Sequence, residues 1–315
     1  MKLITKLIGN NNYEYLGQKV CFSSDGSTVA IARNIDWGGR NVIRISIYQV
    51  NGDSLIQIGE DIADNDVGSK LNDLELSSDG SRVAYSYPYS GTVKVFENQN
   101  KEWVELISIT GDSEYGKSID LADNGSVLAI GTPRAPGKSH LRSSQGWNSG
   151  YVEIWDFAGN TYQLRDIIRH DDVDFNDNYF GNALSISYDG SIIAIVGAQR
   201  LENTTGPGFT TGPGFVTAYA RNRNGEWQQY GNVIYGEETN HYSSVGHHSV
   251  SLSDDGSILA IGDHSIDSNG IDSGHTKVYK FNSNTLTWNQ LGSNIVGEAE
   301  GDFAGKEISL SSQGN

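Results

Sequence analysis

Histidine, a residue type suited to metal binding and proton transfer, is concentrated in one stretch of this chain. Five of the 7 histidines fall between positions 241 and 275, with Asp263 and Asp267 among them. Imidazole nitrogens and carboxylate oxygens are ligands for zinc and related transition metals, although the spacing matches no established metal signature. Separate solvated side chains on a polar rim are the alternative interpretation. The candidate ligands are His241, His247, His248, His264 and His275.

A second stretch places oxygen ligands at alternate positions, as calcium-binding loops do. It contains Asp172, Asp174 and Asn176. However, Asp177 stands where such a loop has a sharp-turn glycine, and no closing glutamate follows. Solvated turn residues are therefore the alternative. Calcium or a transition metal is the candidate cofactor, while the absence of any cofactor is the main prediction.

Aromatic side chains in the irregular segments could stack on sugar rings, because an aromatic face suits a neutral glycan. The candidates for ligand binding are Trp37, Trp147, Phe209 and Phe215. The alternative is that these rings fold back and cover their own loops. No nucleophile elbow, phosphate-binding loop or isolated pair of acids occurs in the sequence, so no catalytic residue is predicted.

The elements that position these residues are marked by a repeated phrase. Its copies end in a turn glycine at positions 26, 80, 125, 190, 256 and 314, which lie 54, 45, 65, 66 and 58 residues apart. Serine, aspartate or asparagine, and glycine dominate the phrase, and such residues supply the positive φ of a hairpin turn. Alternating apolar residues flank each copy and predict a strand on either side. No convincing helix is found.

The repeat therefore predicts an all-β protein, a β-propeller of four-stranded antiparallel blades. We expect one domain over residues 1–315, with five complete blades and a partial sixth. The complete blades are predicted at 17–62, 68–111, 116–170, 181–236 and 246–297. Tryptophans in the fourth strands, at Trp103, Trp227 and Trp288, are expected to pack one blade on another.

The two ends of the chain resemble parts of one further blade. Residues 2–9 align with a fourth strand and residues 305–315 with a first strand. The two segments could form a reduced closing blade, or the chain could be a fragment of a longer repeat protein. The fragment is the interpretation we favour, because a first strand without its second leaves an open sheet edge.

The repeats resemble the FG-GAP family, which forms the propeller blades of integrin α-chains and of many secreted microbial proteins. Tyr179, Phe180 and Gly181, followed by the Gly197–Ala198 pair, carry the resemblance. It implies a secreted or cell-surface repeat protein with a role in adhesion or scaffolding. The calcium ligands of the family's turns are not matched here, since the turn at Gly26 offers one aspartate, Asp25.

Composition limits the partners. The formal charge is −17, from 22 basic and 39 acidic residues, which disfavours nucleic acid and anionic lipid. No signal peptide and no membrane-spanning stretch is visible, so an extracellular or surface location rests on the resemblance. The main functional prediction is a non-enzymatic module that binds a protein or glycan through loops on one face. The alternatives are a metal-dependent hydrolase or lyase centred on the histidine-rich fifth blade, and a purely architectural repeat.

Overall fold

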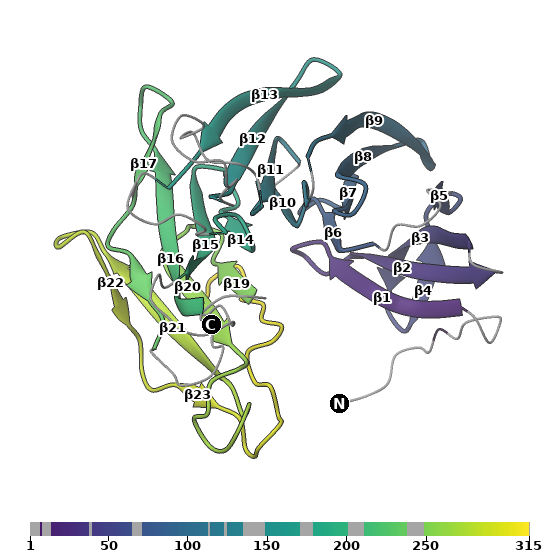
Figure 1. The fold of residues 1–315 in the computed structure, drawn as a ribbon. Coiled ribbons are helices and arrows are strands. Elements are labelled where there is room, and N and C mark those ends of the chain that lie inside the picture. Colours follow the sequence, from purple (N-terminus) through teal and green to yellow (C-terminus); the bar gives the residue numbers. More distant parts are fainter. Residues whose placement is uncertain are drawn as a thin grey trace, which may run out of the picture. The chain divides into compact units, whose positions relative to one another are not determined.

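The computed structural model describes Leu7 and residues 14–37, 40–64, 71–112, 114–122, 125–134, 149–170, 179–200, 211–237 and 249–314. Within these ranges every strand belongs to an antiparallel sheet and no helix occurs (Figure 1). A helix long and apolar enough to cross a membrane is accordingly not found in them. The all-β propeller architecture predicted from the repeat is confirmed.

Five sheets follow one another along the chain, and in each the first four strands pair in sequence order. We call them blades one to five. Blade one holds β1 (Glu14–Phe22), β2 (Thr28–Trp37), β3 (Arg40–Asn51) and β4 (Ser54–Gln57), and β5 (Ile62–Asp64) also pairs with β3. Blade two holds β6 (Asp73–Leu76), β7 (Arg82–Tyr87), β8 (Thr92–Gln99) and β9 (Glu102–Thr110).

Blade three holds β10 (Ser118–Ala122), β11 (Val127–Thr132), β12 (Tyr151–Ala158) and β13 (Thr161–Ile168). Blade four holds β14 (Leu184–Ile186), β15 (Ile192–Arg200), β16 (Thr211–Arg221) and β17 (Trp227–Gln229), with β18 (Ile234–Tyr235) paired to β16. Blade five holds β19 (Ser249–Leu252), β20 (Ile258–Asp263), β21 (His275–Asn282) and β22 (Thr287–Gln290), with β23 (Ile295–Val296) paired to β21.

The repeated phrase forms the turn between the first two strands of every blade. In blade five the Ser253 hydroxyl donates to Asp255 Oδ1 at 2.7 Å and accepts from the Ile258 N–H at 2.9 Å. Gly256 adopts a φ of +65°, and its N–H donates to the Ser253 carbonyl. The turn aspartates are thus engaged within their own turns. In blade one such bonds, first from the Ser27 N–H and then from the Ser23 hydroxyl, lower the pKa of Asp25.

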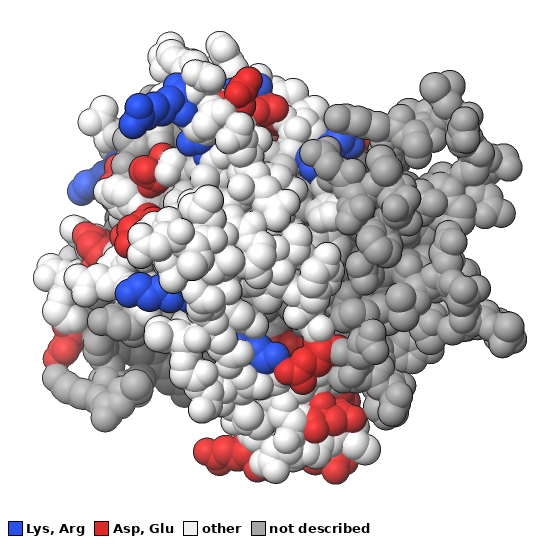
Figure 2. Space-filling model, turned by 90° about the vertical axis from the view of Figure 1, so that its left-hand side faces the viewer, with Lys and Arg blue, Asp and Glu red and all other residues white. Residues whose placement is uncertain are grey.

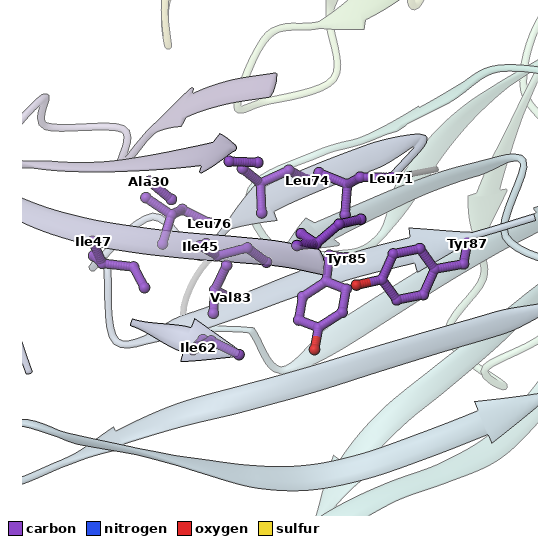
Figure 3. Packing of buried hydrophobic residues seen from close by; sticks show 12 residues of the cluster. Ala30, Ile45, Ile47, Ile62, Leu71, Leu74, Leu76, Val83, Tyr85 and Tyr87 are labelled. Atoms are coloured by element: carbon purple, nitrogen blue, oxygen red, sulfur yellow. The ribbon is translucent and has the colours of Figure 1, made fainter. Parts of the chain in front are cut away.

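Two compact units divide the chain, and the division runs through blade three. In the first unit blades one and two pack face to face (Figure 3). Ala30, Ile45 and Ile47 of blade one belong to one buried cluster with Leu74 and Leu76 of blade two. Full burial of such an aliphatic side chain contributes about 1.5–3 kcal/mol. Alternating strand patterns therefore place a continuous core between blades one and two.

The second unit shows the same packing between blades four and five. Their shared core includes Val196 and Val216 on one side, and Leu252 and Leu259 on the other. Trp288 on β22 is buried there, and its indole N–H donates to the Tyr230 carbonyl at 2.9 Å. Trp103 makes the corresponding bond to Ile58 in the first unit, so these two tryptophans do join neighbouring blades as predicted.

The chain's C-terminal segment differs from the predicted first strand. Residues 305–314 form no strand. The Leu310 N–H instead donates to the Ser251 hydroxyl at 3.1 Å, and the Asp254 N–H donates to the Ser312 carbonyl at 3.0 Å. These contacts hold the segment against blade five through a side chain and a neighbouring turn. Of residues 2–9, only Leu7 lies within the described part.

Candidate functional site

A small pocket opens between blades four and five, within the second unit. It is lined by Ile234 and Tyr235 of β18, and by Ile261, Asp263, His275, Lys277 and Tyr279 of blade five. Its cavity volume is about 10 Å³, close to the least that holds one water molecule. β20 and β21 place the polar residues, because Asp263 pairs with His275 and Ile261 pairs with Lys277 across the ladder. Paired residues of an antiparallel ladder project from the same face of the sheet.

A serine hydroxyl lies within hydrogen-bond distance of the pocket's histidine. Ser268 Oγ is 2.8 Å from Nδ1 of His275. Ser268 belongs to the loop between β20 and β21 and is exposed, whereas His275 is only 3% exposed. A hydroxyl within hydrogen-bond reach of an imidazole is the arrangement of a nucleophile with its general base. The pair is therefore reachable from solvent at the serine and shielded at the base.

The loop that carries Ser268 is held by its own hydrogen bonds. The Gly274 N–H donates to the Ile266 carbonyl at 2.9 Å, and the Asn269 N–H donates to the Ser273 hydroxyl at 2.8 Å. Gly270 adopts a φ of +110°, a backbone conformation that residues with a side chain rarely adopt. Ile266 is buried beneath the loop. These contacts return the chain to β21 so that Ser268 meets the first residue of that strand.

Asp263 presents a buried carboxylate to the pocket. It is 2% exposed, and its Oδ1 accepts from the Ser265 hydroxyl at 3.1 Å. Its other oxygen, Oδ2, is buried and has no hydrogen-bond partner among the described residues. A buried carboxylate oxygen without a donor is costly, which marks this side of the pocket as a place for a small donor group.

Lys277 supplies the pocket's positive charge. Its Nζ forms an ion pair with Glu237, which follows β18, and the lysine side chain is mostly buried while the glutamate is exposed. The hydrogen bond from Lys277 lowers the pKa of Glu237. The ion pair therefore joins blade five to the segment that follows blade four, at the edge of the pocket.

The surroundings keep the imidazole neutral. Burial, and then the charge of Lys277, lower the pKa of His275, while Asp263 and Glu237 act in the opposite sense. A histidine with a lowered pKa is unprotonated at neutral pH and can accept a proton. His275 thus has both the position and the protonation state of a general base.

The predicted histidine cluster is not assembled within the described residues. His264 does not line the pocket, and its ring lies 6.0 Å from that of Phe303. In the ranges that the structure describes, no three His, Cys, Asp or Glu side chains are arranged to hold a metal. The other predicted ligands lie outside those ranges: His241, His247, His248, Asp172, Asp174 and Asn176.

Of the four aromatic residues predicted to stack on sugar rings, only Phe215 has a described side chain. Phe215 is 2% exposed, and its ring lies 4.7 Å from that of His170, so it does not offer a free face. That prediction is wrong, because β16 turns Phe215 into the interior instead of toward the loop. Trp37 closes strand β2, where only its backbone is described. Trp147 and Phe209 fall outside the described residues.

Sequence reasoning missed Ser268 and Lys277. The alternation that predicts β21 places residues 275 and 277 on one face, which could have drawn attention to Lys277. No sequence pattern singles out Ser268, because its position depends on how the loop between β20 and β21 folds back to β21.

Known structures share the fold at low sequence identity. A putative 6-phosphogluconolactonase from Bacteroides fragilis matches with a TM-score of 0.52 and 11% identity over 90% of this chain and 85% of its own. A periplasmic gluconolactonase from Pseudomonas aeruginosa matches with a TM-score of 0.52 and 12% identity, covering 89% of this chain and 69% of its own. A chain of a mitotic checkpoint complex gives 0.55 and 12%, covering 98% and 74%.

These neighbours establish a β-propeller. No protein-family model matches the chain, and no curated protein matches it, so the FG-GAP resemblance stays a prediction.

The comparison corrects the main functional prediction. A non-enzymatic interaction module was expected because the sequence shows no catalytic motif. Several of the propellers that share this fold are instead described as lactonases, which are hydrolases. Of the sequence-based predictions, the alternative of a metal-dependent hydrolase or lyase agrees better with these descriptions than the interaction module does. The lack of a catalytic motif does not exclude an enzyme in this fold, because function lies in sites built on a fold and their residues need not form a sequence signature.

Proposed function

We propose that this protein is a hydrolase that opens an ester or lactone at Ser268 and His275 of blade five. The observation that carries the proposal is the 2.8 Å hydrogen bond between the exposed Ser268 hydroxyl and Nδ1 of the buried His275. The lowered pKa of His275 supports the role of base. The lactonase descriptions of several structural neighbours point to the same reaction class.

The proposed reaction has two steps. Ser268 Oγ attacks the carbonyl carbon while its proton passes to His275 Nδ1, and the ester C–O bond breaks as the leaving oxygen takes that proton. The acyl group is then held as an ester of Ser268. Water attacks this ester and gives a proton to His275, the bond to Oγ breaks, and Ser268 regains its proton. One lactone and one water thus give one hydroxy acid.

A sugar-derived lactone is the substrate class that we propose. Tyr235 borders the pocket and is 55% exposed, so its ring offers a face on which a sugar ring can stack. The neighbours described as acting on gluconolactones belong to this class of compound. The small pocket beside the imidazole admits a group no larger than a water or a hydroxyl.

Turnover of glucono-1,5-lactone and of an aryl acetate tests the proposal. Ser268→Ala and His275→Gln should each lower kcat/KM by about 10²–10⁴-fold, the usual worth of such a group. Ser283→Ala, at an exposed serine in the β21–β22 turn, is the matched control and should leave the rate unchanged. The wild-type rate should fall as the pH drops through the lowered pKa of His275, because the protonated imidazole cannot act as a base. Wild-type turnover that survives Ser268→Ala undiminished would contradict the proposal.

The family type and location are parts of the same proposal. We infer that the blades are FG-GAP repeats, supported by the corner at Tyr179, Phe180 and Gly181. Phe180 is fully buried there and Gly181 has a φ of +94°. A site of action outside the cytoplasm is supported by the periplasmic neighbour. Fractionation of cells that express the natural gene would test the location.

A further inference from the structure

We propose that Asp263 is the positioning residue for His275 and acts on its imidazole through one water molecule in the pocket between them. The proposal rests on the proposed function, since it completes the pair formed by Ser268 and His275. It assigns a role and a bound water to a carboxylate for which the two-residue mechanism has no use.

One oxygen of the buried Asp263 carboxylate lacks a hydrogen-bond donor among the described residues. Oδ1 accepts from Ser265, whereas the buried Oδ2 has no partner among the described residues. Buried polar atoms in folded proteins are almost always hydrogen-bonded, to the protein or to ordered water. A donor is therefore expected beside Oδ2.

The imidazole of His275 lies beside the Asp263 carboxylate in the pocket. Asp263 and His275 are directly paired across β20 and β21, and both side chains line the pocket. Side chains in such a pair have Cβ atoms about 4.5–5.5 Å apart. Nδ1 of His275 is engaged by Ser268, so the remaining ring nitrogen is the one that can serve the pocket. The paired carboxylate and imidazole make no direct hydrogen bond.

The pocket that Asp263 and His275 line is small. A cavity volume of about 10 Å³ fits one water and leaves no room for a larger group. A water there accepts from the Nε2–H of His275 and donates to Asp263 Oδ2. This bridge fixes the proton on Nε2 and leaves the lone pair of Nδ1 facing Ser268, which is the tautomer that a base needs.

The charged groups around the His275 imidazole shift its pKa, so the contribution of Asp263 can be measured by titration. Asp263 faces it from β20, Lys277 and Tyr279 from its own strand, and Tyr235 and Glu237 from β18 and the segment that follows. Asp263 and Glu237 raise the pKa of His275, whereas Lys277 lowers it. Removing the charge of Asp263 alone should therefore shift the titration of His275 downward.

The test is the titration of the His275 ring, followed by NMR in wild-type protein and in Asp263→Asn. The pKa of His275 should fall by about one unit in the variant, as expected on loss of a close opposite charge. Asp267→Asn is the matched control, because it removes the same charge from an exposed position in the adjoining loop and should leave that pKa in place. A crystal structure should show one water within hydrogen-bond distance of Asp263 Oδ2 and the His275 ring.

Activity separates this proposal from the proposed function. Asp263→Asn should lower kcat by about 10-fold or more while KM stays near its wild-type value, since groups that orient a functional imidazole through its other ring nitrogen typically contribute about 10–100-fold. Absence of wild-type turnover together with the shifted His275 titration would remove the proposed function and leave the role of Asp263 standing. An unshifted His275 pKa in Asp263→Asn, or a dry pocket in the crystal, would overturn the role of Asp263.

Discussion

At the scale of single residues, the serine that opens each turn has a defined task. Ser23, Ser77, Ser187 and Ser253 each donate to the aspartate two positions later and accept from the N–H five positions later. Blade three has Ala122 at this place, and there the Gly125 N–H donates to the Ala122 carbonyl. The serine is therefore a stabilising choice that the turn can lose in one blade.

Ser253→Ala should destabilise the protein. Ser253 is 1% exposed, and its loss leaves the buried Ile258 N–H without a partner, which costs about 1–3 kcal/mol. Urea unfolding should show a lower midpoint with an unchanged slope. Ser257→Ala, which removes one exposed hydroxyl bond to Asp255, should stay within about 0.5 kcal/mol of wild type. Equal losses in both variants would show that burial of the first serine does not matter.

Residue types alone predicted the turns but not the site. Asp-Gly and Asn-Gly have a local conformational preference that acts wherever they stand, so the turn glycines could be placed from the sequence. The contact between Ser268 and His275 depends instead on a loop that positive-φ residues Gly270, Asp272 and Gly274 bring back to β21. Histidine clustering drew attention to blade five, where we propose the site, but it pointed to metal binding and not to a serine.

At the scale of elements, consecutive blades are joined by a corner as well as by their faces. Three three-residue segments, 114–116, 179–181 and 303–305, each begin and end with a residue of positive φ. The last residue of each segment is a glycine: Gly116, Gly181 and Gly305. A Cβ at Gly181 would lie 2.8 Å from the Tyr151 carbonyl oxygen, and one at Gly305 would lie 2.4 Å from that of His275. At Gly181 and Gly305 glycine is required because the corner rests directly on the backbone of the preceding blade.

Trp288→Phe should weaken the junction between blades four and five. The indole is 5% exposed, packs against Phe281 and Tyr230, and donates to the Tyr230 carbonyl. Losing the N–H bond and part of the ring should cost about 2 kcal/mol, measured by urea unfolding.

The control is Trp227→Phe, in the fourth strand of the preceding blade. The Trp227 indole N–H is buried without a hydrogen-bond partner among the described residues. Removing an unsatisfied donor costs little, so the change should be within about 1 kcal/mol. A larger loss at Trp227 than at Trp288 would contradict the assignment of Trp288 as the residue that joins the blades.

At the scale of the whole molecule, the charge balance is strongly acidic. The formal charge of −17 leaves many carboxylates without a basic partner, since 39 acidic residues face 22 basic ones. On the face shown in Figure 2, acidic and basic side chains are interspersed, with acidic groups along its lower edge. Local ion pairs such as Arg82 with Glu97, at 2.7 Å, offset the repulsion only where they occur. Mutual repulsion of the remaining acids opposes the compact state.

Salt should therefore raise the thermal stability of the protein. Increasing NaCl from about 0.01 to 0.2 M shortens the screening length from about 30 Å to under 10 Å, which weakens repulsion between distant carboxylates. Surface ion pairs also weaken, but each contributes at most about 1 kcal/mol and they are outnumbered by unpaired acids. Calorimetry should show Tm rising by a few degrees and then levelling off, with KCl giving the same curve. A Tm that falls with added salt would show that paired charges, and not the excess of acids, dominate the electrostatics of the fold.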